Sequence, residues 1–188
     1  MNCVIGIDPG VEGAIVVLSP DGKIIQAYNM PFLSKQVLKK KRKPKPDALP
    51  PKKPKKENPF TYERTCDFVG INQIIGYIKK NHGPEMDIYV ENITHLFGLP
   101  SATNFKLGHA VGVIYSALTS QESDFYLLPT KKWQDAVWSK EEKAMKDAKK
   151  KEKTELAFER LFPGYTGINS DGVRDAALIA YAGLRGGV

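Results

Sequence analysis

The sequence predicts an α/β protein with a five-stranded mixed sheet flanked by helices, and two observations lead to that prediction. Short runs rich in Val and Ile, typical of β-strands, occur near residues 2–8, 12–18, 23–30, 86–92 and 124–129. Longer segments with apolar residues at helical spacing occur near residues 65–81, 101–118, 139–161 and 170–184. Three antiparallel strands come first, and a strand that returns after a helical crossover can lie parallel beside the first one.

The opening strands are predicted from the stretch "VIGIDPGVEGAIVVL" at residues 4–18. Its two apolar runs flank a Pro-Gly turn, as in an antiparallel hairpin. Side chains alternate between the two faces of a strand, so Val4, Gly6 and Asp8 share one face. A Pro-Asp-Gly turn in "SPDGK" at 19–23 then leads to the third strand.

Each predicted helix has its own pattern. The first carries five apolar residues at helical spacing, Phe68, Ile71, Ile74, Ile75 and Ile78. The second has two glycines that permit close packing, and its apolar stripe consists of Phe105, Val111, Ile114 and Leu118. The third is long and charged, and the last begins with Ser170 or Asp171 as its N-cap.

A chain of 188 residues with 41% apolar residues suits one globular domain, residues 1–188. Its two cysteines, Cys3 and Cys66, are too few for a disulfide or zinc framework and indicate structural thiols in a reducing compartment. No apolar stretch approaches the ~18 residues of a membrane span, and the N-terminus lacks the pattern of a signal peptide. We therefore expect a cytoplasmic protein without a membrane partner.

A basic, proline-rich insert interrupts this domain at about residues 34–62. Within it, residues 39–56 hold ten Lys or Arg, five Pro and one acid, which gives them a charge of +9 in a chain of net charge +7. We expect an extended segment that binds polyanions. Its candidate DNA contacts are Lys39, Lys40, Lys41, Arg42 and Lys43. A solubilising loop is the alternative, and "KKKRK" also looks like a nuclear localisation signal.

Acidic residues close two of the predicted strands. Asp8 ends the first apolar run and Glu91 ends "MDIYVE", although a carboxylate among apolar neighbours is costly unless a partner neutralises it. The last helix adds Asp175 and, four residues earlier on the same face, Asp171. Capping is the alternative for two of these residues, because Asp8 could satisfy the Pro-Gly turn and Asp171 could cap the helix.

These carboxylates can converge at one edge of the sheet. If the first strand is central, Asp8 and Glu91 become neighbours, and the last helix brings its two aspartates beside them. Oxygen ligands without a histidine or thiol favour Mg²⁺ or Mn²⁺. Two such ions ~4 Å apart can activate a water and stabilise the leaving oxygen in phosphodiester hydrolysis. The predicted catalytic and metal-binding residues are therefore Asp8, Glu91, Asp171 and Asp175.

Four stretches together resemble the RuvC family of Holliday-junction resolvases, particularly its phage-type members. They are "GIDPG", "YVEN", "FKLGHAVGVI" and "DGVRDAALIAYAG", in the order and approximate spacing of that family. The resemblance implies an RNase H-like fold, an acidic two-metal site and a homodimer that nicks a four-way DNA junction symmetrically. It further implies that Asp8 bridges the metals, with Glu91 and Asp175 as further ligands. A phage-type member would act in the cytoplasm of a bacterial host.

The chain departs from the cellular members of that family at two positions. Where their pattern has a ligand three residues before the last aspartate, this chain has Gly172, and Asp171 lies four residues before. A helix allows either spacing. Those members also set an aromatic wedge shortly after the glutamate. Here Phe97 comes six residues after Glu91, and it is either such a DNA-contacting wedge or a core residue.

Lysines outside the insert are candidate phosphate contacts at the rim of the predicted site. They are Lys131, Lys132, Lys149, Lys150, Lys151 and Lys153. A solvated helix face is the alternative for those within the charged run 140–153.

The leading hypothesis is a Mg²⁺-dependent endonuclease that resolves Holliday junctions and accepts other branched DNA. An ATPase of the actin and sugar-kinase type also begins with a hairpin like "GIDPGVEGAIVVL", but 188 residues are too few for its two lobes. A non-catalytic DNA-binding module would use only the insert, and it would gain from losing carboxylates near DNA. Cleavage of a labelled four-way junction in Mg²⁺ separates the three hypotheses.

Overall fold

The computed structural model describes residues 3–38, 60–93, 100–145 and 148–186. A central sheet is formed by strands Val4–Asp8 (β1), Ala14–Leu18 (β2), Ile24–Asn29 (β3), Asp87–Asn92 (β6) and Tyr126–Pro129 (β7). Their order is β3-β2-β1-β6-β7. The first three strands are antiparallel neighbours, whereas β6 runs parallel to both β1 and β7. The predicted mixed sheet with the first strand at its centre is confirmed.

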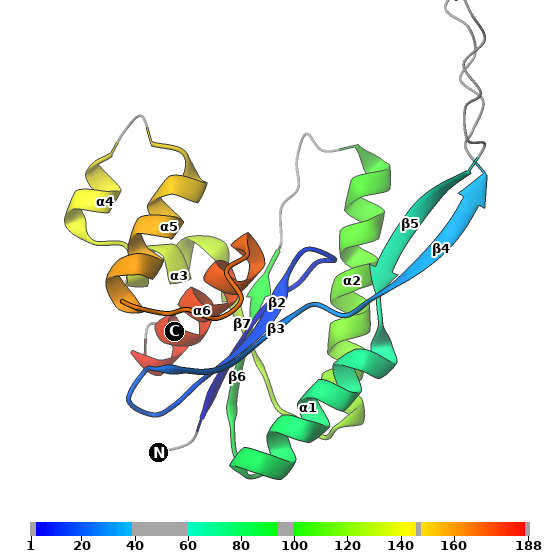
Figure 1. Ribbon diagram of the computed structural model, residues 1–188, viewed down its shortest axis with the longest axis horizontal. Helices are drawn as coiled ribbons and strands as arrows, with labels where there is room; N and C mark the ends of the chain where they lie inside the picture. The colour runs from blue at the N-terminus through cyan, green and yellow to red at the C-terminus, as the bar shows by residue number, and fades with distance from the viewer. Residues whose placement is uncertain (1–2, 39–59, 94–99, 146–147, 187–188) are drawn as a thin grey trace, which may run out of the picture.

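Helices cover both faces of this sheet (Figure 1). One face packs against Phe68–His82 (α1) and Ser101–Ser120 (α2). The other packs against Thr130–Val137 (α3), Lys150–Leu161 (α5) and Asp171–Leu184 (α6). Because strand side chains alternate, Ile5 and Ile7 join the first of these cores and Val4 joins the second. None of the described helices is long and apolar enough to span a membrane.

Helix α6 lies unusually close to the middle of the sheet. A Cβ atom on Gly6 of β1 would lie 2.0 Å from the carbonyl oxygen of Ala176, and one on Gly183 would lie 2.2 Å from the ring of Tyr89 on β6. Glycine at these two positions therefore allows α6 to cross β1 and β6 in close contact. Asp175, next to Ala176, is carried to the end of β1 by this packing.

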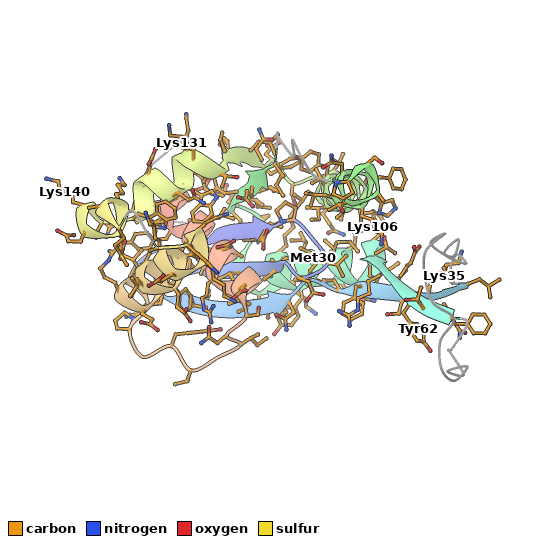
Figure 2. The ribbon with its side chains drawn as sticks, turned by 90° about the horizontal axis from the view of Figure 1, so that it is seen from above. Met30, Lys35, Tyr62, Lys106, Lys131 and Lys140 are labelled. Atoms are coloured by element: carbon orange, nitrogen blue, oxygen red, sulfur yellow. The ribbon has the colours of Figure 1, made fainter. Side chains whose placement is uncertain are left out.

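A second, two-stranded sheet was not predicted. Strands Phe32–Leu38 (β4) and Phe60–Cys66 (β5) pair antiparallel and form a ribbon that extends away from the central sheet beside α2 (Figure 1). Lys35 and Tyr62 project from it (Figure 2). Residues 34–38 and 60–62, at the two ends of the expected insert of about 34–62, therefore belong to paired strands. Residues 39–59 lie outside the described part of the chain.

Two expectations about helices are wrong, and one helix was missed. The predicted single helix at 139–161 is two helices, because a Ser139–Glu142 capping box starts the short helix Lys140–Ala144 (α4) and α5 begins only at Lys150. Helix α3 was not predicted at all. The buried residues of α2 are Ala110, Ile114, Ala117 and Leu118. Phe105 of the predicted stripe is instead 74% exposed, because the N-terminal half of α2 extends beyond the sheet.

The N-cap of the last helix and the state of the two cysteines agree with the sequence predictions. Ser170, one of the two predicted caps, is the N-cap of α6 and accepts a hydrogen bond from the Val173 backbone N–H. Cys3 and Cys66 are free thiols, and Cys66 is buried in the core.

Candidate active site

Asp8 and Glu91 lie side by side at the ends of adjacent strands. Strands β1 and β6 are parallel, and their register pairs Ile7 with Val90, so the next residues of the two strands are Asp8 and Glu91. Both side chains lie on the sheet face that carries Gly6 and Tyr89, which is the face covered by α6. The predicted convergence of these two acids is confirmed.

Asp175 on α6 completes a cluster of three carboxyl groups. Burial raises the pKa of Asp8 well above its ordinary value, and the charges of Asp175 and Glu91 raise it further. Burial likewise raises the pKa of Asp175 to about 6, with Glu91 and Asp171 adding to the shift. These mutual effects show that the three groups share one electrostatic environment. Repulsion of this kind is what a bound cation would relieve.

Lys150, the first residue of α5, faces this cluster. Its charge lowers the pKa of both Asp8 and Asp175, against the raising effects of burial and of the acids. Its Nζ also lies 5.3 Å from the centre of the Trp133 ring. A pocket of about 260 Å³ between α5 and α6 is lined by Lys150, Lys151, Thr154, Asp171, Arg174 and Asp175. Of the predicted lysines, Lys150 and Lys151 therefore lie beside the carboxylates.

Asp171 lies at the outer side of this pocket and is engaged in ion pairs. One carboxylate oxygen lies 2.7 Å from Lys151 Nζ, and the other lies 2.7 Å from Arg174 Nη1. The hydrogen bond from Lys151, followed by the charges of Lys151 and Arg174, lowers the pKa of Asp171. Arg174 also pairs with Glu155 at 3.2 Å. Sequence reasoning did not select Arg174, although its place one residue before Asp175 puts it near the site.

Gly172 has a steric explanation. A Cβ atom at this position would lie 2.4 Å from the Glu12 carbonyl oxygen and 2.7 Å from the Gly13 carbonyl carbon. The turn between β1 and β2 thus packs directly on the first turn of α6, and no side chain fits there. A ligand at position 172 is excluded by this contact.

Glu91 is held by two donors that sequence reasoning missed. The Thr130 hydroxyl donates to Glu91 Oε1 at 2.7 Å, and the Trp133 indole Nε1–H donates to the same oxygen at 3.0 Å. Both donors belong to the unpredicted helix α3. In the stretch "PTKKWQ", only the two lysines were predicted to have a role, as phosphate contacts.

The other predicted DNA contacts either do not line this pocket or lie outside the described residues. Lys131 and Lys132 are exposed on α3, and Lys131 points outward into solvent (Figure 2). Lys149 is the N-cap of α5, and Lys153 Nζ lies 5.7 Å from the centre of the Trp138 ring. The remaining predicted contacts fall on residues outside the described ranges, namely Lys39, Lys40, Lys41, Arg42, Lys43 and Phe97.

Comparison with known proteins identifies the architecture. No protein-family model and no curated protein matches this sequence. Thermus thermophilus RuvC in complex with a Holliday junction substrate is similar in structure, with a TM-score of 0.57 and 17% sequence identity over 96% of this chain and 90% of that one. This chain has the RuvC fold. A second structure of T. thermophilus RuvC gives a TM-score of 0.56 and 16% identity over 98% of this chain and 96% of that one. The expected RNase H-like architecture is thereby confirmed.

The donor chemistry of this site suits a hard divalent cation. Three carboxylates converge without a histidine or thiol, and two of them have raised pKa values. Within the described ranges, no three Asp, Glu, His or Cys side chains are grouped closely enough to hold an ion as they stand. The residues therefore fit a cation by donor type and charge.

Proposed function

We propose that this chain is a metal-dependent endonuclease that cleaves branched DNA, with the four-way junction as its principal substrate. The observation that carries the proposal is the meeting of Asp8, Glu91 and Asp175 on one face of a RuvC fold, at the end of its two central parallel strands. The solved relative of the same fold is bound to a Holliday junction substrate.

The three carboxylates would hold the cations, with Mg²⁺ favoured by their donor type and Mn²⁺ as a substitute. Bound cations supply the activation of a water and the stabilisation of the leaving oxygen. Asp171 is less suited to be a ligand, because each of its oxygens is already paired with a cationic side chain, Lys151 or Arg174. Lys150 and Lys151 can then contact DNA phosphates at the rim of the site.

A homodimer is part of this proposal, because symmetric cleavage of a junction needs two sites. The exposed half of α2 is the surface we assign to it. Phe105 is 74% exposed there, and a Cβ atom added to Gly108 or Gly112 would meet nothing within 4 Å. A second α2 helix could therefore approach closely along this side.

The test is cleavage of an end-labelled four-way junction in Mg²⁺, compared with linear duplex and with reactions containing ATP. We expect the wild-type protein to cut the junction and to ignore ATP. Asp8→Asn and Glu91→Gln should each lower the rate at least about 100-fold while retaining junction binding, because each removes a ligand of the proposed cations.

Asp87→Asn is the matched control, since Asp87 is an exposed acid at the opposite end of the strand that carries Glu91. It should cut normally. Wild-type rates in Asp8→Asn or Glu91→Gln would contradict the assigned site. Junction binding without any cleavage would favour a non-catalytic DNA-binding module.

A further inference from the structure

Helix α3 contributes two hydrogen-bond donors to a single oxygen of Glu91. Thr130 Oγ1 and Trp133 Nε1 lie 2.7 and 3.0 Å from Oε1. Within the described chain, no hydrogen bond to Glu91 Oε2 is found. The two oxygens of this carboxylate are thus in different environments.

The backbone explains how α3 reaches Glu91. Strand β7 is parallel to β6, and its register pairs Glu91 with Leu128 and Asn92 with Pro129. The chain turns into α3 directly after Pro129, which puts Thr130 and the next turn of the helix beside the end of β6. Trp133 is fully buried and Glu91 is only 6% exposed, so the contact is shielded from water.

We propose that Thr130 and Trp133 are positioning residues that fix Glu91 so that Oε1 is held by the protein and Oε2 is left to bind a cation. This inference rests on the proposed metal-dependent function. A buried carboxylate needs donors to remain charged, and partners that orient a metal ligand commonly affect metal affinity by about 10–100-fold.

Trp133 also connects the two charged sides of the site. Its indole N–H contacts Glu91, while its ring lies 5.3 Å from the Nζ of Lys150. The charge of Lys150 in turn lowers the pKa of Asp8 and Asp175. Trp133 therefore contacts both Glu91 and Lys150, the lysine whose charge acts on the two aspartates of the site.

The indole N–H gives a direct spectroscopic test. The chain has two tryptophans, Trp133 and Trp138, so a ¹⁵N–¹H spectrum of the full-length protein contains two indole resonances. Trp133→Phe and Trp138→Phe assign them. Titration of the metal-free protein with Mg²⁺ should shift the Trp133 resonance, because the carboxylate that accepts its hydrogen bond through Oε1 then binds the cation through Oε2. The Trp138 resonance should stay in place.

The second readout is Mn²⁺ affinity, measured by electron paramagnetic resonance. Thr130→Val and Trp133→Phe each remove one donor, and each should weaken Mn²⁺ binding about 10-fold. Thr130→Val retains the side-chain volume, whereas Trp133→Phe replaces a buried indole by a smaller ring. Both variants should need correspondingly more Mg²⁺ for half-maximal junction cleavage. Trp138→Phe is the matched control, because the Trp138 Nε1–H is buried without a partner among the described residues and its loss removes no contact.

The outcomes separate this inference from the proposed function. If the wild type binds Mn²⁺ and cuts junctions, but both variants keep its affinity and the Trp133 resonance ignores Mg²⁺, the positioning role is wrong and the nuclease proposal stands. If the wild type binds no Mn²⁺, both are wrong. If Trp133→Phe loses its native spectrum, Thr130→Val decides the matter, because it leaves the buried ring in place.

Discussion

Two carboxyl groups of this site, those of Asp8 and Asp175, are in surroundings that disfavour their charged forms. Burial is the largest cause of the raised pKa values of Asp8 and Asp175, and the charge of Glu91 raises both further. Lys150 offsets only part of the repulsion. Without a cation the folded protein therefore contains carboxylates that destabilise it at neutral pH, and this has a measurable consequence.

We predict that Asp175→Asn stabilises the metal-free protein at pH 7.5 but not at pH 4. The pKa of Asp175 is about 6 in the folded protein, against about 3.9 in an unfolded chain. Between these values the folded state binds more protons, so the free energy of unfolding falls as pH rises. Removing the charge abolishes that loss. Thermal unfolding in EDTA should show a gain of a few degrees at pH 7.5, since about 1 kcal/mol shifts Tm by roughly 2–4 °C at this size.

The gain should disappear at pH 4, where the wild-type carboxyl is protonated as well. Asp87→Asn is again the control, because no carboxylate cluster surrounds this exposed acid, and its Tm should follow the wild type at both pH values. A Tm for Asp175→Asn at or below that of the wild type at pH 7.5 would show that the carboxylate cluster does not destabilise the fold.

At the scale of elements, α2 is divided into two halves with different surroundings. Its C-terminal half buries Ile114, Ala117 and Leu118 against the sheet and α1. Its N-terminal half lies beside β5 and leaves Phe105 in solvent (Figure 1). An exposed aromatic residue on a helix with open glycines is the feature on which the dimer proposal rests.

We predict that Phe105→Asp weakens self-association at least about 10-fold, because it places a charge in a surface that two copies would bury. Sedimentation velocity of the wild type at micromolar concentration should show a dimer, free or on junction DNA. Tyr77→Asp, at a residue 53% exposed on α1, is the control for a charge on another helix. A wild type that sediments as a monomer in both conditions would rule out the α2 dimer.

At the scale of the whole molecule, positive charge is concentrated in one segment. Residues 39–56 carry +9, which leaves −2 for the rest of the chain. The carboxylates of the proposed metal site belong to β1, β6 and α6, which are separate from the ribbon that leads into this segment. Binding to DNA and cleavage of DNA should therefore be separable by mutation.

We predict that replacing residues 39–59 by Asn-Gly weakens binding to linear and branched DNA alike. Leu38 and Phe60 are paired across the ribbon, so a two-residue turn can join them without disturbing β4 or β5. The salt dependence of binding should become less steep. A plot of log K against log[salt] has a slope of about −0.9 per neutralised phosphate, so each phosphate contact that is lost reduces its magnitude by about 0.9. Cleavage at saturating protein and low salt should be retained.

A variant with all ten basic residues of 39–56 retained but the prolines replaced by serine is the matched control, and it should keep the wild-type slope. If the Asn-Gly variant binds both DNAs with unchanged affinity and slope, the insert is not a DNA tether.

Local sequence patterns are sufficient to predict the central sheet and the three converging acids. Strand alternation places Asp8 on the face of Gly6, and both Asp8 and Glu91 follow apolar runs that pair in parallel. These features depend on local periodicity and chain order, which can be read from neighbouring residues. The same is true of Ser170 as the cap of the last helix.

The support of the site, in contrast, depends on tertiary contacts. Thr130 and Trp133 are 39 and 42 residues from Glu91 in sequence, and their helix is too short to show a clear period. The ion pair of Asp171 with Lys151 joins α6 to α5, and the contact that requires Gly172 joins α6 to the turn between β1 and β2, so both form only when distant segments pack together. The β4–β5 ribbon pairs residues on either side of the insert. Local patterns do not encode such contacts, because their free energy arises only when distant segments are brought together.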